Sequence, residues 1–105
     1  MFKAYERSIE LIRELKPLVQ QLGKQDPDLA KQLRKAASSV ALNLAEGNRR
    51  GGKDKPYHFR VAAGSAAEVG AALDVAQAWG HLQTPDRTLQ TLDEVRAMLW
   101  RLTHP

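Results

Sequence analysis

The sequence predicts an all-α protein, with one domain over residues 1–105 folded as an antiparallel up-down four-helix bundle. Apolar residues recur at steps of three and four in four segments, which is the periodicity of helices with one buried face. Glycines at positions 23, 47 and 80 end the first three segments, and prolines at 27, 56 and 85 stand near the next starts. Because the connections are short, neighbouring helices are expected to run antiparallel.

The first two segments each carry an apolar face. The first contains Pro17, which is expected to kink or divide the helix, and it stops at Gly23. Its stripe consists of Phe2, Tyr5, Ile9, Ile12, Leu15, Val19 and Leu22. The second begins at Asp26, a capping residue, and is expected to stop at Gly47. Its face consists of Leu29, Leu33, Ala36, Ala37, Val40, Ala41 and Leu44.

The third segment starts near Asp54 and stops at Gly80, and the fourth starts at Thr84-Pro85-Asp86. One face of the third consists of Val69, Ala72, Leu73, Ala76 and Trp79. The narrower stripe of the fourth consists of Leu92, Val95, Leu99 and Leu102. With these faces buried together, the four helices form a common core.

Four polar residues are predicted to form a structural network inside the bundle: Asn43, Glu46, Ser65 and Glu68. Ser65 and Glu68 fall on the apolar face of the third segment, where a carboxylate needs donors or a cation. Glu46 stands at a helix C-terminus and opposes the macrodipole, so Arg49, Arg50 or a neighbouring helix should compensate it.

The sequence gives no support for catalysis or for a metal or other cofactor. Carboxylate metal sites in bundles use Glu-x-x-His, which does not occur, and His58, His81 and His104 stand at or near helix ends. There is no G-x-S-x-G and no P-loop. We therefore expect a non-enzymatic protein without cofactors.

The positive charge is concentrated in one region. The net charge is +4, but residues 31–60 hold eight basic and two acidic residues, and the rest hold eight basic and ten acidic. This favours nucleic-acid binding through Arg49, Arg50, Lys53, Lys55 and Arg60, extended along the second helix by Lys31, Arg34 and Lys35. The alternatives are a solvated face, or a scaffold module whose basic loop docks an acidic protein partner.

Aromatic and apolar residues outside the core stripes suggest further contacts. Tyr57 and Phe59 could stack on bases, although Phe59 suits the core better. Leu42, Leu89 and Trp100 lie off the core stripes and are predicted to form an oligomer interface.

A helical segment with the spacing R-x-A-x-S-x-x-x-x-N-x-A-E-G, a basic loop and a helical segment with A-G-S-x-x-E follow one another in residues 34–68. This pattern resembles the small bacterial four-helix-bundle proteins named after 23S rRNA intervening sequences. The matching residues are Arg34, Ala36, Ser38, Asn43, Ala45, Glu46, Gly47, Arg50, Phe59, Ala63, Gly64, Ser65 and Glu68. Family members commonly have a Trp in the opening helix, where this chain has Phe2 and Tyr5.

The resemblance implies a ring-shaped homo-oligomer, typically a pentamer. The chain is also similar to the accessory proteins of diversity-generating retroelements, which implies RNA or DNA and a reverse transcriptase as partners. The sequence has no cysteine, no signal peptide and no apolar run of the roughly 20 residues that span a bilayer. We therefore expect a cytoplasmic protein without membrane contacts.

Overall fold

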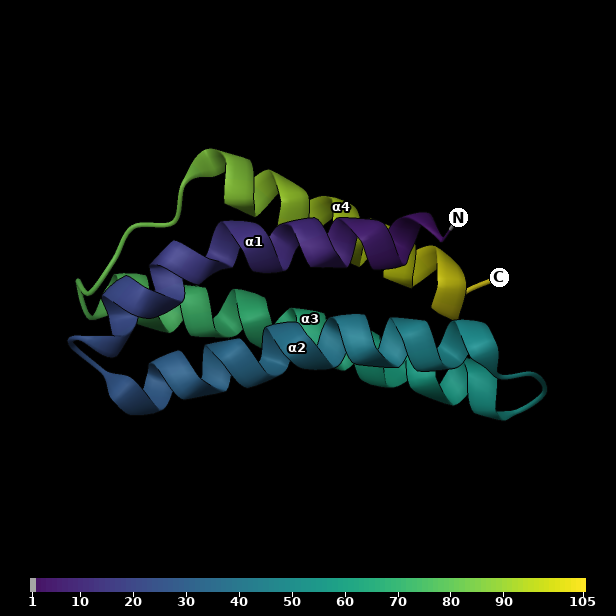
Figure 1. Ribbon diagram of the computed structural model, residues 1–105. Helices are drawn as coiled ribbons and strands as arrows, with labels where there is room; N and C mark the ends of the chain where they lie inside the picture. Colours follow the sequence, from purple (N-terminus) through teal and green to yellow (C-terminus); the bar gives the residue numbers. More distant parts are fainter. Residues whose placement is uncertain (1) are drawn as a thin grey trace.

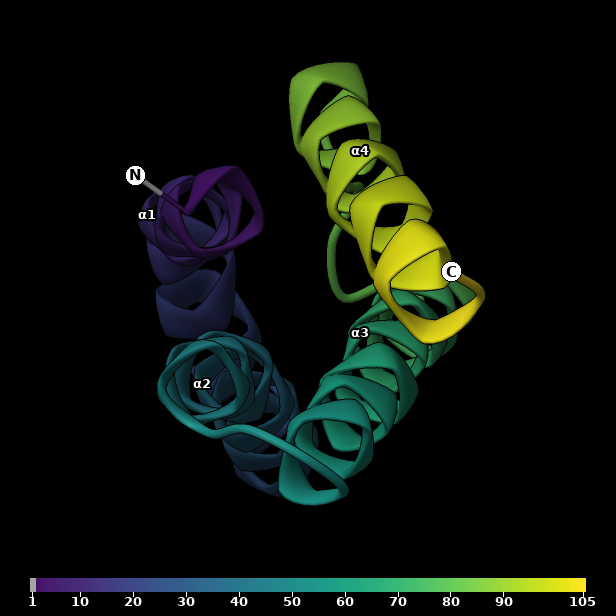
Figure 2. The ribbon, with the colours of Figure 1, turned by 90° about the vertical axis from the view of Figure 1, so that its right-hand side faces the viewer.

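The computed structural model describes residues 2–105, so Met1, where the predicted domain begins, lies outside the described residues. The chain forms four helices, α1 (Lys3–Gly23), α2 (Pro27–Arg49), α3 (Asp54–Ala78) and α4 (Asp86–Thr103). No strand occurs within residues 2–105. The helices lie in the order α1, α2, α3, α4 around a particle of 43 × 24 × 20 Å, and α4 also contacts α1 (Figures 1 and 2). None of the helices in this range combines the length and apolarity needed to cross a bilayer.

All four helices contribute to one core. Every residue of the predicted α2 face is buried, and so are Leu92, Val95 and Leu99 of α4, which confirms these two stripes. Ten of the fully buried large side chains are aliphatic residues that line the centre: Leu11, Leu15, Leu22, Leu33, Val40, Leu44, Val69, Leu73, Val95 and Leu99. Burial of this apolar surface is the main contribution to the stability of the fold.

The predicted stripe of α1 is rotated from the true core face. The buried residues are Ala4, Ser8, Leu11, Leu15, Leu18 and Leu22. Ile12 and Val19 are only half-buried, and Tyr5 is exposed. The reason is that α1 packs against both α2 and α4, so its buried face points between these two helices. The predicted stripe lies to one side of this face, toward α2. Pro17 lies on the exposed side of one uninterrupted helix, so it does not divide α1.

One prediction about a helix end and one about a core face are wrong. Gly47 does not stop α2, which continues to Arg49. Gly47 is buried, and a Cβ atom there would lie 2.7 Å from Cε1 of Phe59, so this glycine permits close packing of α3. Trp79 was predicted on the core face of α3, but it is 70% exposed because it follows the last helical residue. Directly after it, Gly80 has a φ of 78°, and the chain turns away from the helix axis there.

The start of α2 is capped as predicted, but the start of α4 is not. Oδ1 of Asp26 accepts a hydrogen bond of 3.1 Å from the Leu29 amide. At α4 the N-cap is Pro85, and Thr84 is buried, with no hydrogen bond from its hydroxyl among residues 2–105.

Candidate nucleic-acid interface

Three separate parts of the chain meet at one end of the bundle. Figure 1 shows the start of α1, the α2–α3 connection and the end of α4 at the same end. The rings of Phe2 and Phe59 lie 6.0 Å apart between centroids, which ties the start of α1 to the first turns of α3. This end therefore combines the predicted loop cations with Lys3 and Arg101. Sequence reasoning missed both residues because they lie about 50 positions from the loop, and only the topology brings them there.

Arg50 is held by carboxylates on both sides of the loop. Its Nε donates to Oε1 of Glu46 at 2.8 Å, and its Nη1 lies 3.5 Å from Oδ2 of Asp54. The hydrogen bond from Arg50 is the main cause that lowers the pKa of Glu46, and the charges of Arg49, Arg50 and His58 add to it. Glu46 is therefore compensated at the C-terminus of α2. Arg50 connects the two helices, so its charge is less available to a ligand.

Arg49 is also paired, since its Nη1 lies 3.8 Å from Oε2 of Glu46. Five other cations of this end have no acidic partner within residues 2–105. Lys53, Lys55 and Arg60 are exposed, and none of them forms a salt bridge with an acid within residues 2–105. The same holds for Lys3 and Arg101 in this range. Nζ of Lys55 stands 6.0 Å from the centroid of the Phe59 ring. We call these five residues the basic end.

The opposite end carries acidic residues. The α1–α2 and α3–α4 connections meet there (Figure 1), and the residues near them include Asp26, Asp28, Asp74 and Asp86. Nε2 of His81 lies 3.8 Å from Oδ2 of Asp26, and the side chain of Gln21 donates to the His81 carbonyl at 3.3 Å. Lys24, Lys31 and Arg87 stand near the same connections, so at this end, which we call the acidic end, acidic residues exceed basic ones only slightly.

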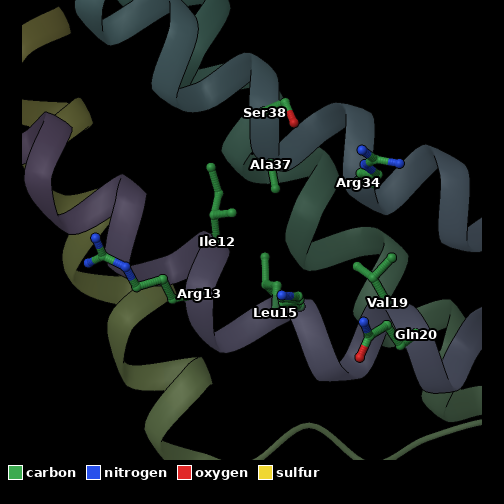
Figure 3. A pocket seen from close by; sticks show the side chains of 9 residues that line it. Ile12, Arg13, Leu15, Val19, Gln20, Arg34, Ala37 and Ser38 are labelled. Atoms are coloured by element: carbon green, nitrogen blue, oxygen red, sulfur yellow. The ribbon is translucent and has the colours of Figure 1, made fainter.

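The predicted extension of the patch along α2 is separated from the loop cations. Between residues 36 and 48 no basic residue occurs, and at 1.5 Å per residue Lys35 and Arg49 are about 21 Å apart. Arg34 instead joins Arg13 and Lys16 of α1 around a groove of about 540 Å³ (Figure 3). Its apolar lining comes from both helices and consists of Ile12, Leu15, Val19 and Ala37. The sequence could not show this cluster, because its cations come from two helices.

The predicted polar network has different members. Nδ2 of Asn43 donates to the carbonyl and hydroxyl oxygens of Ser39, at 3.0 and 3.1 Å. The Ser65 hydroxyl donates to Oγ of Ser39 at 2.7 Å, and Nδ1 of His58 lies 3.0 Å from Oδ1 of Asn43. Because that amide oxygen is an acceptor, Nδ1 of His58 carries the hydrogen. Sequence reasoning missed His58 by treating it only as a metal ligand.

Glu68 does not belong to this network. Its side chain is exposed and forms no hydrogen bond or salt bridge with another residue of the described range. The buried arc of α3 runs through Ala62, Ala66, Val69 and Leu73, and Glu68 is 100° from Val69 on the helix. The predicted apolar face was centred too far toward Glu68 and Trp79.

The three predicted interface residues are exposed but lie on different surfaces. Leu42 is 68% exposed on the outer side of α2. Trp100 is 60% exposed and Leu89 is 39% exposed, both on α4. The Trp100 ring is stacked on His104 at 4.4 Å and lies beside Ala63 of α3.

Four helices around one core, with no strand in residues 2–105, define a small all-α protein with one cationic end. The chain belongs to a particular family of such proteins, which is described as 23S rRNA-intervening sequence protein and matches residues 1–101. The resemblance drawn from residues 34–68 is thereby confirmed over nearly the whole chain. The family description gives an RNA-related context. A search of curated proteins finds no match.

Proposed function

We propose that this protein is a non-enzymatic, oligomeric protein that binds the phosphate backbone of RNA or DNA at its basic end. The observation that carries this proposal is that Lys3, Lys53, Lys55, Arg60 and Arg101, from three segments at one end of the bundle, have no acidic partner within residues 2–105. Flexible lysines and arginines at an exposed end suit a sequence-independent contact with phosphates.

Such binding depends strongly on salt. Each neutralised phosphate releases condensed counterions, so five contacts give a slope of log K against log salt of about −4.5 for duplex DNA and about −3.5 for a single strand. Arg50 contributes less than the five free cations, because Glu46 and Asp54 already hold its guanidinium.

The test is a salt titration of binding to generic RNA and DNA, with two matched triple variants. Replacement of Lys53, Lys55 and Arg60 by glutamine is expected to weaken binding at least tenfold and to reduce the slope by about 2 to 3. Replacement of Lys24, Lys31 and Lys35 by glutamine removes the same charge away from the basic end, leaves the cations of the α1–α2 groove in place, and is expected to change affinity little. Equal losses in both variants, or no binding by the wild type, would refute the proposal.

The alternative is that the basic end docks an acidic protein partner. It predicts that polyglutamate of matched charge competes with RNA as effectively as an unlabelled RNA does. On our proposal, unlabelled RNA competes at much lower charge concentration, because binding to its densely charged backbone releases more condensed counterions.

We further propose that the antiparallel up-down bundles assemble side by side into a ring, which the family resemblance suggests is a pentamer. The α1–α2 groove and the outer side of α3–α4 lie on opposite sides of the bundle (Figure 2). A contact between two different surfaces is heterologous and closes a ring when the rotation permits it.

The two surfaces correspond in position along the bundle. Lys16, Arg34 and Asp93 each stand seven residues from the helix end at the acidic end of the bundle, about 10 Å along the axis. Trp100 stands 14 residues from that end, about 21 Å along the axis, whereas the groove lining extends only to Ile12 and Ser38, 11 residues from it. Copies with the same orientation can thus place Asp93 level with the groove cations.

This arrangement has a functional consequence. Because all copies in a cyclic ring point the same way, the basic ends gather on one rim, where modest individual contacts add up to high avidity. Native mass spectrometry tests the assembly, and a monodisperse monomer at micromolar concentration would contradict it.

A further inference from the structure

The start of α3 presents two aromatic rings in opposite directions. Tyr57 and Phe59 are two residues apart, so on a helix they point about 200° apart. Phe59 is 3% exposed and packs toward Phe2 and Gly47, whereas Tyr57 is 56% exposed. The Tyr57 and His58 rings meet at 74° with centroids 5.2 Å apart, so they are not stacked on one another.

Cations stand on both sides of the exposed ring. Lys53 lies four residues before Tyr57 and Arg60 three residues after it, so all three share one face of α3. Lys53 is the N-cap residue, just before the first helical residue, but its backbone dihedral angles are helical. It therefore lies on the same face of α3 as Tyr57 and Arg60. The two cations are about 10 Å apart along the axis. Beyond Arg60 the same face continues at Gly64, and a Cβ atom there would meet nothing within 4 Å.

From this order of cation, ring and cation we infer that the nucleic acid bound at the basic end is single-stranded, and that Tyr57 stacks on one of its bases. This inference rests on the proposed function and names the ligand class of the same site. Lys53 and Arg60 contact the phosphates on either side of the stacked base. Gly64 leaves room for the strand to continue along α3.

The preference for a single strand follows from the shape of the two ligands. In a duplex the bases are stacked on one another and present only their edges in the grooves. A tyrosine that stands out from a helix surface therefore meets no free base face on a duplex. In a single strand the base faces are accessible, and stacking on an aromatic ring contributes to affinity for every base type.

Phe59 does not take part, although the sequence offers it as a second ring. Its ring is enclosed by Phe2, by the Gly47 backbone and by Lys55, whose Nζ is 6.0 Å from the ring centroid. Lys55 thereby covers the ring on the solvent side. Of the two rings at the start of α3, only Tyr57 is therefore available for stacking.

The experiment measures affinity by fluorescence anisotropy for a labelled single-stranded RNA of about 12 nucleotides and for the duplex of the same sequence, at one salt concentration. A Tyr57→Ala substitution is expected to weaken single-strand binding about 5- to 100-fold, the range found for the loss of one stacked base. Duplex binding is expected to change less than twofold. Tyr57→Phe is expected to retain single-strand affinity, because it keeps the ring.

Trp79→Ala provides the matched control, because it removes an exposed aromatic residue at the opposite, acidic end and is expected to leave both affinities unchanged. Should Tyr57→Ala fold poorly, Tyr57→Gln with a 2-aminopurine oligonucleotide supplies a direct signal. The wild type is expected to change the probe fluorescence on binding, and Tyr57→Gln is expected to abolish that change.

Equal effects of Tyr57→Ala on single-stranded and duplex RNA, or no effect on either, would overturn the inference. If affinity still decreases as the salt concentration rises, and is still lower in the Lys53, Lys55 and Arg60 triple variant, the proposed function remains supported. If the wild type binds no nucleic acid, both the proposed function and this inference are overturned.

Discussion

Substitution of Gly47 by alanine tests why α3 comes so close to the end of α2. The new Cβ atom would lie 2.7 Å from Cε1 and 2.8 Å from Cδ1 of Phe59, and 3.2 Å from Cβ of His58. These contacts are shorter than packed carbon atoms tolerate, so the Phe59 ring has to move within a well-packed core. Overpacking of this kind costs about 1–3 kcal/mol. The better helix propensity of alanine offsets at most about 1 kcal/mol of that cost.

Gly64→Ala provides the matched control, because it makes the same chemical change in a helix where nothing lies within 4 Å of the new atom. It is expected to stabilise the protein by up to about 1 kcal/mol. The difference between the two variants therefore isolates the packing cost, about 1–3 kcal/mol in the free energy of unfolding. Urea denaturation followed by circular dichroism measures this difference through the transition midpoints.

A second variant identifies the ring as the obstacle. In a Phe59→Leu background, the additional cost of Gly47→Ala should shrink, because the smaller side chain gives way. The reasoning is refuted if Gly47→Ala is as stable as Gly64→Ala, or if its cost is the same with leucine at position 59. A shift of about 1 kcal/mol corresponds to about 4–8 °C in Tm for a domain near this size, so thermal unfolding gives an independent check.

Three further predictions concern charges and a helix cap. Because the pKa of Glu46 is lowered below its usual 4.5, its ion pairs contribute stability that is fully present above pH 4.5 and is lost as the pH falls through the lowered value. Glu46→Gln should remove that acid-dependent part of the urea midpoint measured between pH 6 and 2, and an unchanged profile would contradict the assignment. Asp26→Ala should cost about 0.5–2 kcal/mol in urea unfolding through loss of the α2 cap, whereas Asp28→Ala, without a capping bond, should cost less. Arg34→Glu should weaken assembly in sedimentation velocity, and Asp93→Arg should restore it in the double variant, because the proposed ring places these two residues against each other across copies. Absence of restoration in the double variant would refute that contact.

The α2 stripe was predictable from sequence because small and aliphatic residues there occupy one face without interruption. The α1 stripe was not, because this helix has apolar residues over a broad arc and periodicity cannot say which part faces the centre. Contacts with both α2 and α4 decide that Ser8 is buried and Tyr5 is exposed. For the same reason Glu68 was misplaced, since α3 is rich in alanine nearly all round and gives a weak signal of orientation.

The candidate site was predictable in its central part. The run of cations around the two loop glycines is a local property, and local charge density can be read directly from residue order. The distance between that run and Lys31, Arg34 and Lys35 could also be worked out from the sequence, because the rise per residue of a helix is known. The neutralisation of Arg50 depends on Glu46 and Asp54 standing on either side of the loop at contact distance, which is a matter of geometry.

By itself the sequence determined the four helices, the capped start of α2 and the family, because these depend on neighbours within a few turns of one another. Only the tertiary structure decided which flank of each helix is buried, that Lys3 and Arg101 join the loop cations, and that Gly47 accommodates Phe59. These features depend on atoms far apart in the chain, whose distances are set by how the helices pack. Local periodicity contains no information about such distances.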